Sequence, residues 1–231
     1  MKKIYIITGA NGFLGNNIIR QLTKETDSEI RALVLPNDTV NALDGINCSI
    51  FQGDVTKKDS LHALFDVPEN AVLYVIHCAA IVHIHSKFNF ETYDVNVNGT
   101  KNIAEKAMEK NAKLIYVNSV HAITEKPNHE TITEINHFEP EKVKGQYAKT
   151  KAAAANYVLD MMKKKRLNAC ILHPSGMIGP NDFGRSHLTQ LIIDFANGRL
   201  KACVKGGYDF VDVRDVADGV IKACTKGTCG E

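Results

Sequence analysis

The sequence lacks a strong excess of charge of either sign. Its 231 residues include 28 Lys and Arg against 26 Asp and Glu, so the formal net charge is only +2. Partners such as nucleic acids and membrane surfaces recruit proteins through strongly basic patches, and neither is implied here. The one basic run, at residues 163–166, falls at the end of an expected helix, where cations complement the helix dipole.

The pattern of a metal site is also missing. None of the six cysteines forms a CxxC pair, and no group of Cys and His has zinc spacing. His83 and His85 lie close together, but no carboxylate accompanies them at a recognisable spacing. We therefore expect no metal, and we interpret His83, His85 and His121 as residues at the rim of a pocket or in solvent.

Long apolar runs are absent as well. No run is long enough to span a bilayer, and the N-terminus enters a strand directly, without the features of a secretory signal. Several cysteines lie in apolar, strand-like runs, where a free cysteine behaves as a small hydrophobic residue. We therefore expect a cytoplasmic protein that contacts no membrane.

Six short apolar runs rich in β-branched residues are present, at 3–8, 29–35, 49–53, 72–78, 113–118 and 169–173. They lack strict polar alternation, which is typical of strands buried on both faces of a parallel sheet. Helical patterns lie between most of them, including one that starts at 98–100, one at 147–165 and one at 216–226 capped by Asp215. This alternation predicts an α/β fold with a doubly wound parallel sheet, the Rossmann fold, in a single domain over 1–231.

The first strand runs into a glycine-rich turn that is followed by an amphipathic helix. Gly9, Gly12 and Gly15 stand at the positions where a tight turn, close approach to a pyrophosphate and close packing of helix on strand each need glycine. An ordinary glycine turn is the alternative. Because the pattern stands between a strand and a helix, we favour a dinucleotide-binding turn.

The GxxGxxG spacing of this turn resembles the short-chain dehydrogenase/reductase superfamily, and more narrowly its extended, epimerase/dehydratase-like branch. Further segments match in order along essentially the whole chain: Gly53-Asp54-Val55, His77-Cys78-Ala79-Ala80, Asn96-Val97-Asn98-Gly99-Thr100, His173-Pro174-Ser175-Gly176-Met177-Ile178-Gly179-Pro180 and Phe210-Val211-Asp212-Val213-Arg214-Asp215-Val216-Ala217. The resemblance implies a nicotinamide cofactor, NAD or NADP. The cofactor-binding residues that it implies are Gly9, Asn11, Gly12, Phe13, Leu14, Asp54, Val55, Ala79, Ala80, Tyr147, Lys151 and Pro174.

Tyr147 and Lys151 are four residues apart, so they share one face of a helix. A nearby ammonium can lower the pKa of a tyrosine toward neutrality, and the phenol can then act as an acid or base. Ser119 directly follows the fifth strand, where its hydroxyl could hold a substrate oxygen. The resemblance implies that Ser119, Tyr147 and Lys151 are the catalytic residues of a hydride transfer. A surface tyrosine and a turn serine are the alternatives.

The end of the second strand departs from the reductase pattern. Leu35 stands where reductase-like members commonly have an arginine that accepts the 2′-phosphate of NADP. Arg31 is not an obvious substitute, and Asp38 could bind the ribose of NAD, so the choice between NAD and NADP stays open. His173 replaces the arginine that is common before Pro174 in relatives.

Extended relatives continue beyond the last motif into a small C-terminal lobe that closes over the substrate. We therefore expect either a truncated chain or a lobe that is reduced or missing, with residues 174–231 contributing part of it.

The function that this resemblance favours is an NAD(P)-dependent oxidoreductase acting on a carbonyl or alcohol carbon, similar to dihydroflavonol reductase-like proteins. One alternative is an NAD-dependent nucleotide-sugar epimerase, and another is a non-catalytic NAD(P)-sensing protein. The expected substrate is a small carbonyl compound or a sugar. A homodimer is possible through the alanine-rich face at 152–155, although these alanines could equally pack on the chain's own sheet.

Overall fold

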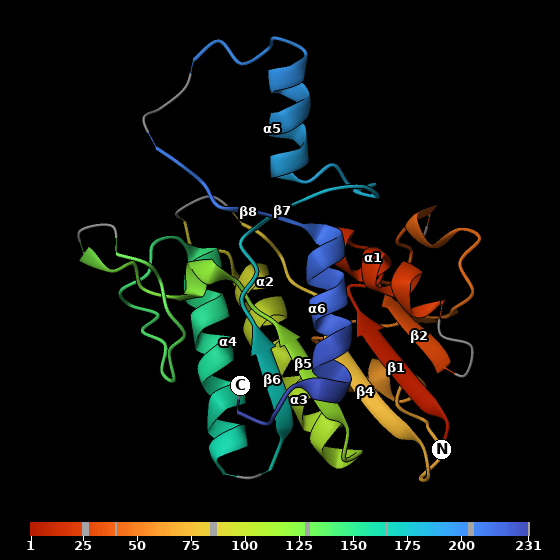
Figure 1. The fold of residues 1–231 in the computed structure, drawn as a ribbon. Helices are drawn as coiled ribbons and strands as arrows, with labels where there is room; N and C mark the ends of the chain where they lie inside the picture. The colour runs from red at the N-terminus through yellow and green to blue at the C-terminus, as the bar shows by residue number, and fades with distance from the viewer. Residues whose placement is uncertain are drawn as a thin grey trace.

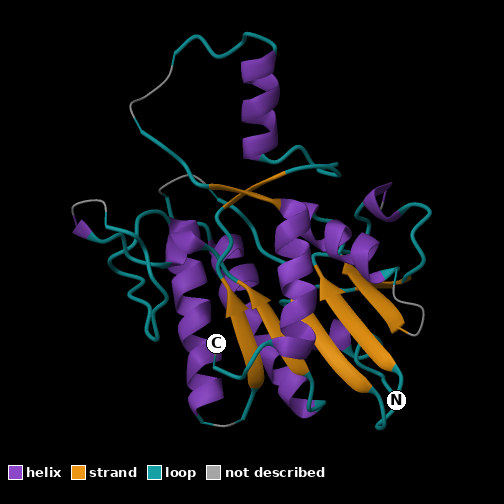
Figure 2. Cartoon of the chain, viewed as in Figure 1, coloured by secondary structure: helices purple, strands orange, loops and turns teal. Residues whose placement is uncertain are grey.

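Six parallel strands form the central sheet (Figures 1 and 2), and each neighbouring pair runs in the same direction. The computed structural model describes residues 1–24, 28–39, 41–83, 87–127, 130–164, 166–202 and 206–230. In spatial order the strands are β3 (Ser49–Gln52), β2 (Ser28–Val34), β1 (Lys3–Thr8), β4 (Val72–His77), β5 (Lys113–Val117) and β6 (Asn168–Leu172). The predicted doubly wound sheet is confirmed, and its order reverses between β1 and β4, where such folds bind ligands.

Both faces of the sheet are covered by helices, which explains why the strands lack polar alternation. Ile6 and Leu114 face the layer of α3 (Thr100–Glu109) and α4 (Gln146–Lys163). Ile7 and Ile115, the next residues along the same strands, pack toward α1 (Phe13–Leu22) and α6 (Val213–Lys226). Because neighbouring side chains point to opposite faces of a strand, each strand needs apolar residues at consecutive positions.

Two helix starts differ from the sequence predictions. The helix expected from 98–100 begins earlier, because α2 (Phe90–Tyr93) and the π-helical η3 (Asp94–Gly99) lead into α3 without a break, and the Asn89 side chain caps α2 by accepting from the Thr92 N–H. The last helix begins at Val213 rather than 216, because Asp212, not Asp215, provides the cap. Short 3-10 turns complete the fold: η1 (Asn41–Leu43), η2 (Lys58–Leu61) and η4 (Val120–Ala122).

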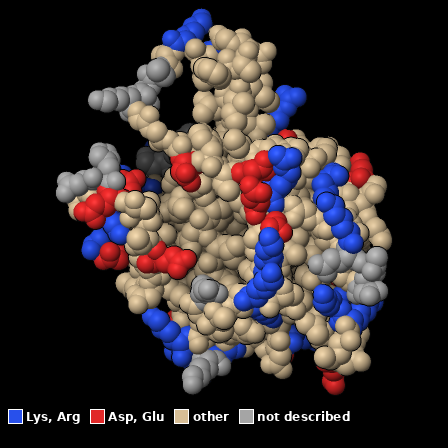
Figure 3. All heavy atoms as spheres, in the orientation of Figure 1, with Lys and Arg blue, Asp and Glu red and all other residues tan. Residues whose placement is uncertain are grey.

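The C-terminal part adds a second, small sheet of two parallel strands, β7 (Gly176–Ile178) and β8 (Phe210–Asp212). Between them, α5 (His187–Ala196) stands apart from the main body in Figure 1, and none of its residues is buried. Among the described residues, no helix combines the length and apolarity needed to cross a membrane. On the face drawn in Figure 3, positive and negative side chains are interspersed, in keeping with the small net charge.

The alanine-rich face of α4 packs inside the chain. Ala152, Ala154 and Ala155 are fully buried in the core under the sheet. These alanines therefore serve the chain's own fold, and the homodimer stays a prediction.

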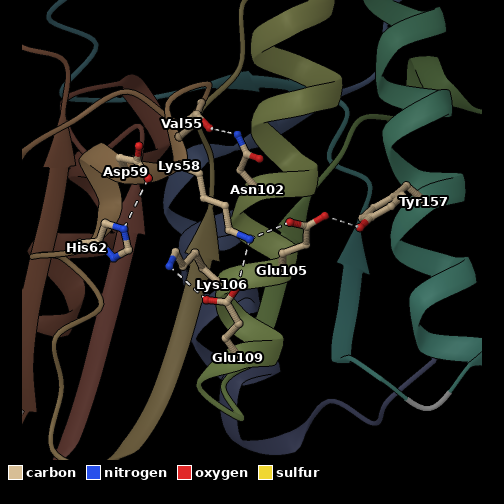
Figure 4. Close-up of polar contacts among 9 residues, drawn as sticks. All are labelled: Val55, Lys58, Asp59, His62, Asn102, Glu105, Lys106, Glu109 and Tyr157. Atoms are coloured by element: carbon tan, nitrogen blue, oxygen red, sulfur yellow. Dashed lines mark hydrogen bonds and ion pairs between the residues drawn. The ribbon is translucent and has the colours of Figure 1, made fainter.

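Outside this core, an ionic cluster joins η2, α3 and α4 (Figure 4). In this cluster, Lys58 Nζ lies 3.0 Å from both Glu105 and Glu109.

A chain of buried polar groups crosses the core at the carboxyl ends of β1 and β4. The Thr100 hydroxyl donates to Asn96 O (2.7 Å), so it must accept from His77 Nε2 (2.9 Å). His77 Nδ1 then carries no proton and accepts from the Thr8 hydroxyl (2.7 Å), which in turn accepts from Ala79 N–H (3.2 Å). Every group is satisfied only while the imidazole is neutral.

This chain predicts a loss of stability in mild acid. Burial, with a smaller effect of the Lys151 charge, lowers the pKa of His77 from 6.5 to about 3. The unfolded chain therefore takes up a proton first as pH falls below 6.5, and stability is lost between that pH and about 3. By pH 5 the expected loss due to His77 is about 2 kcal/mol in the free energy of unfolding.

Urea unfolding at pH 7.5 and pH 5 measures this loss, with His77→Gln reducing the difference between the two values. His62→Gln, at an exposed histidine, is the matched control and leaves the difference unchanged. An equal pH dependence in the wild type and His77→Gln would contradict the prediction.

Candidate active site

The glycine turn is formed by backbone packed on backbone. Gly9 has a φ of +64°, and a Cβ built there would lie 2.8 Å from Ala79 N at the end of β4. A Cβ at Gly15 would lie 2.2 Å from Gly9 O. Gly12 caps α1 and accepts the Asn16 N–H (3.0 Å), so the free N–H groups of the helix begin directly at the turn. These contacts require glycine and leave the N-terminus of α1 open toward an anion.

A cleft of about 330 Å³ opens beside this turn, between the ends of β1, β2 and β4. Seven of the residues predicted to bind the cofactor line it: Gly9, Asn11, Gly12, Asp54, Val55, Ala79 and Ala80. Phe13 and Leu14 do not line this cleft, because they pack toward the core beneath α1. The cleft also contains a buried acceptor, Asn11 Oδ1, that has no hydrogen-bond partner among the described residues.

Acidic and apolar side chains surround the end of the cleft at β2. Leu35 is 55% exposed, and Asp38 lines the cleft and accepts from Asn11 Nδ2 (3.3 Å). Arg31 is buried and donates to Glu29, Leu64 O and Asp66 O, so its guanidinium is engaged away from the cleft. No Lys or Arg is among the residues that line the cleft, all of which belong to the described part of the chain.

Asp54 follows β3, and its carboxylate forms hydrogen bonds with Thr56, two residues further along the chain. Asp54 Oδ1 accepts from both Thr56 N (2.9 Å) and the Thr56 hydroxyl (2.8 Å). The next residue, Val55, packs against Gly99, where an added Cβ would lie 2.6 Å from Val55 Cγ2. The Asn102 side chain donates to Val55 O (2.9 Å), as Figure 4 shows. The α3 helix thereby holds the floor of the cleft in place.

Ser119, Tyr147 and Lys151 converge at the carboxyl end of β5. Ser119 is buried just after this strand, and its hydroxyl contacts that of Tyr147, which lies in the first turn of α4 after the left-handed Gly145 (φ +83°). Lys151, one turn further on, donates from Nζ to Val117 O (2.6 Å). Its ammonium also lies 4.5 Å from the centre of the Tyr116 ring, a cation–π contact.

The electrostatics of Tyr147 differ from the sequence prediction. Burial raises the pKa of Tyr147, and the contact with the Ser119 hydroxyl opposes this rise. Burial also lowers the pKa of Lys151 to about 7. The expectation that Lys151 lowers the pKa of Tyr147 is wrong for this structure, because the ammonium is directed at the Val117 carbonyl and burial dominates at the phenol.

The profile of the NAD-dependent epimerase/dehydratase family matches residues 5–231. The chain belongs to this family. The resemblance to the extended short-chain dehydrogenase/reductase superfamily is therefore confirmed, as is the expectation of a nicotinamide dinucleotide cofactor.

The curated relatives are longer than this chain. It is 33% identical to sterol demethylase protein B of Methylococcus capsulatus, over 98% of this chain and 67% of that protein. It is 29% identical to a putative dihydroflavonol 4-reductase of Synechocystis, over 94% of this chain and 61% of that protein. The crystal structure of gox2253 superimposes with a TM-score of 0.88 at 30% identity, covering 99% of this chain and 68% of that one. The chain thus spans about half to two thirds of the curated relatives that it matches.

The residues of this family member fit a dinucleotide. The turn offers bare backbone at Gly9 and Gly15, where a side chain would collide with the neighbouring backbone, and at Gly12, where an added Cβ would lie 3.1 Å from Gly9 O. The unpartnered Asn11 Oδ1 provides an acceptor within the same cleft. Pro174, one of the predicted cofactor-binding residues, follows β6, and its carbonyl accepts Val120 N–H (3.2 Å) next to Ser119.

Sequence reasoning missed several residues that shape the site. Asn16 and Asn17 in the first turns of α1 donate to Asn181 O (3.0 Å) and Pro180 O (3.1 Å), which ties the segment after β7 to the glycine turn. Two adjacent amides on a buried helix face were the available signal. Asn118 is another, because both its side-chain polar atoms are buried without a partner among the described residues.

A second cavity, of about 540 Å³, is lined by Val120 and His121, the residues that follow Ser119. Its other walls come from the loop before α4, from Ser175 just before β7, and from the segment between β7 and β8, which includes Tyr208. His121, predicted to lie at a pocket rim, is placed there. His85 lies outside the described residues, and no cluster of three metal-ligating side chains occurs within the described ranges.

Proposed function

We propose that this family member is an NAD(P)-dependent oxidoreductase that transfers a hydride to or from a carbonyl or alcohol carbon of a small molecule. The observation that carries the proposal is the convergence of Ser119, Tyr147 and Lys151 at the end of β5. The glycine-turn cleft lies at the same carboxyl edge of the sheet. A hydroxyl pair and an ammonium are thus held at the edge where the cofactor would lie.

Each side chain has a distinct role in this proposal. A bound nicotinamide ring supplies or accepts the hydride. Tyr147, whose raised pKa keeps it protonated at neutral pH, donates the proton to a carbonyl oxygen or, in the reverse direction, accepts it. Ser119 donates a hydrogen bond that orients this oxygen. Lys151 directs one N–H to Val117 O and would hold the ribose hydroxyls with the others.

The proposed substrate is a ring compound that carries a secondary alcohol or ketone. Several relatives bear names of this kind, including a 3 beta-hydroxysteroid dehydrogenase/Delta 5-->4-isomerase of Vaccinia virus that is 30% identical over 78% of this chain. The second cavity is consistent with such a compound, because apolar side chains such as Val120, Ile123 and Val143 line it. We further propose that residues 174–231 contribute part of the substrate lobe, since Ser175, Tyr208 and Asp209 line the same cavity.

A nucleotide-sugar epimerase is the second candidate, because UDP-glucose 4-epimerase of Vibrio cholerae is 28% identical over 78% of this chain. An epimerase recycles its cofactor within one turnover, so the purified protein would retain NAD tightly. Free exchange of cofactor, with net formation of NADH, supports the dehydrogenase. The non-catalytic sensor is less favoured because the Tyr147 and Lys151 pair is retained. The cytoplasmic location and the absence of a nucleic-acid partner stay predictions.

Removing the Tyr147 hydroxyl tests the proposed chemistry. We expect Tyr147→Phe to lower kcat at least about 100-fold, because proton transfer is lost, while NADH binding stays unchanged. Turnover is measured with pregnenolone, taxifolin and UDP-glucose as probes. Tyr157→Phe is the matched control, since it removes a hydroxyl from the same helix in the surface cluster of Figure 4. Equal activity in both variants would contradict the role of Tyr147.

Fluorescence titration tests the choice of cofactor. We expect NADH to bind at least about tenfold more tightly than NADPH, because Asp38 lines the cleft and no cation there can pair with a 2′-phosphate. Leu35→Arg should reduce the preference for NADH over NADPH. Leu35→Gln, which adds polarity without charge, should leave this preference unchanged. If the wild type binds NADPH more tightly than NADH, the predicted preference of this cleft for NADH is contradicted.

A further inference from the structure

Two segments that are far apart in the sequence meet beside the proposed catalytic tyrosine. His121 follows β5, and Tyr208 precedes β8, yet His121 Nε2 and the Tyr208 hydroxyl are 2.6 Å apart. Tyr208 also packs closely against β7, because a Cβ added at Gly176 would be 2.4 Å from Tyr208 Cε1. The bare glycine backbone and the imidazole therefore fix the tyrosine ring from two sides.

The rings extend from Tyr147 toward the small sheet. The Tyr147 and His121 rings make an edge contact with centroids 6.5 Å apart. The His121 and Tyr208 centroids are 5.9 Å apart. Tyr208 remains 48% exposed, so a large part of its surface is open to a ligand. A ligand whose oxygen is held by Tyr147 would thus meet His121 and then Tyr208.

Both side chains line the second cavity, together with apolar residues and with the charged residues Glu125, Lys142, Lys144 and Asp209. Val120, Ile123 and Val143 contribute to the lining, whereas the Lys142 ammonium at its edge is paired with Glu139 (2.6 Å). Flat apolar rings pack favourably against aromatic faces and branched aliphatic side chains. The cavity therefore combines two aromatic side chains with apolar and charged ones.

We propose that His121 and Tyr208 form a hydrogen-bonded aromatic wall that selects fused-ring alcohols and ketones over smaller ones. This inference rests on the oxidoreductase function proposed above and names the residues that set its specificity. The wall acts by stacking against rings remote from the reacting carbon. Burial raises the pKa of Tyr208, so its hydroxyl stays protonated at neutral pH and can donate to the imidazole. That bond keeps the ring in the orientation that a flat ligand needs.

Equilibrium binding to the NADH complex tests the wall without turnover. Pregnenolone and cyclohexanol each present a ring alcohol, which NADH cannot reduce, and a constant NADH concentration confirms that the remote ketone of pregnenolone is not reduced either. The fluorescence of bound NADH then reports both dissociation constants. We expect the wild type to bind pregnenolone more tightly than cyclohexanol. Tyr208→Leu, which removes the ring, should lower this preference about tenfold. Tyr208→Phe, which removes only the hydroxyl, should lower it about two- to fivefold.

Phe210→Leu is the matched control. Phe210 contacts Tyr208 (centroids 5.4 Å apart) but does not line the cavity, so its replacement should leave the preference unchanged. If Tyr208→Leu fails to bind NADH, the test rests on Tyr208→Phe and His121→Asn. Both variants should weaken the binding of pregnenolone and leave the binding of NADH and cyclohexanol unchanged. A preference that is absent in the wild type, or unaltered in the Tyr208 and His121 variants, overturns the wall. If the wild type prefers pregnenolone as expected but does not oxidise it with NAD⁺, the oxidoreductase proposal is contradicted instead.

Discussion

The close packing of backbone on backbone at the glycine turn is the constraint on which the rest of the site depends. Gly9 lies against the end of β4, and Gly15 lies against Gly9, at separations that leave no room for a Cβ. This packing brings the N-terminus of α1 to the point where the strand order reverses, so that free N–H groups face a cleft and not the core. The cleft can form at this turn because Gly9 and Gly15 carry no side chains.

A buried polar network carries the same constraint across the sheet to the proposed catalytic helix. Thr100 links His77 to the backbone of Asn96. The Asn96 side chain bonds the loop after β4 at Ile81 and also donates to Thr150 (3.0 Å). The Thr150 hydroxyl in turn donates to Tyr147 O (2.8 Å). The strand that forms the cofactor cleft and the helix that carries the tyrosine are thus held by one set of directional bonds, which is costly to leave half-satisfied.

The features that the sequence could predict are those encoded by neighbouring residues. The six strands were predictable because burial on both faces requires continuous apolar runs, and the turn because a tight bend between strand and helix requires glycine at fixed positions. The start of α6 was not predictable in the same way. Asp212 and Asp215 both have capping side chains, and only the end of β8 decides that the Arg214 N–H is donated to Asp212. The pKa of Tyr147 was misjudged for a similar reason, since burial and the direction of the Lys151 ammonium are properties of the packed core.

The two halves of the site are therefore specified by different kinds of information. Ser119, Tyr147 and Lys151 lie on one strand end and one helix, so short motifs are sufficient to reveal them. The second cavity is instead assembled from the loop before α4 and the segment that leads into β8, and the contact of His121 with Tyr208 spans a long stretch of chain. A residue such as Tyr208 can change without disturbing the glycine turn or the polar network, because it contacts neither. The proposed substrate preference therefore depends on the contacts around this cavity, whereas the proposed hydride transfer depends on residues that the family's motifs identify.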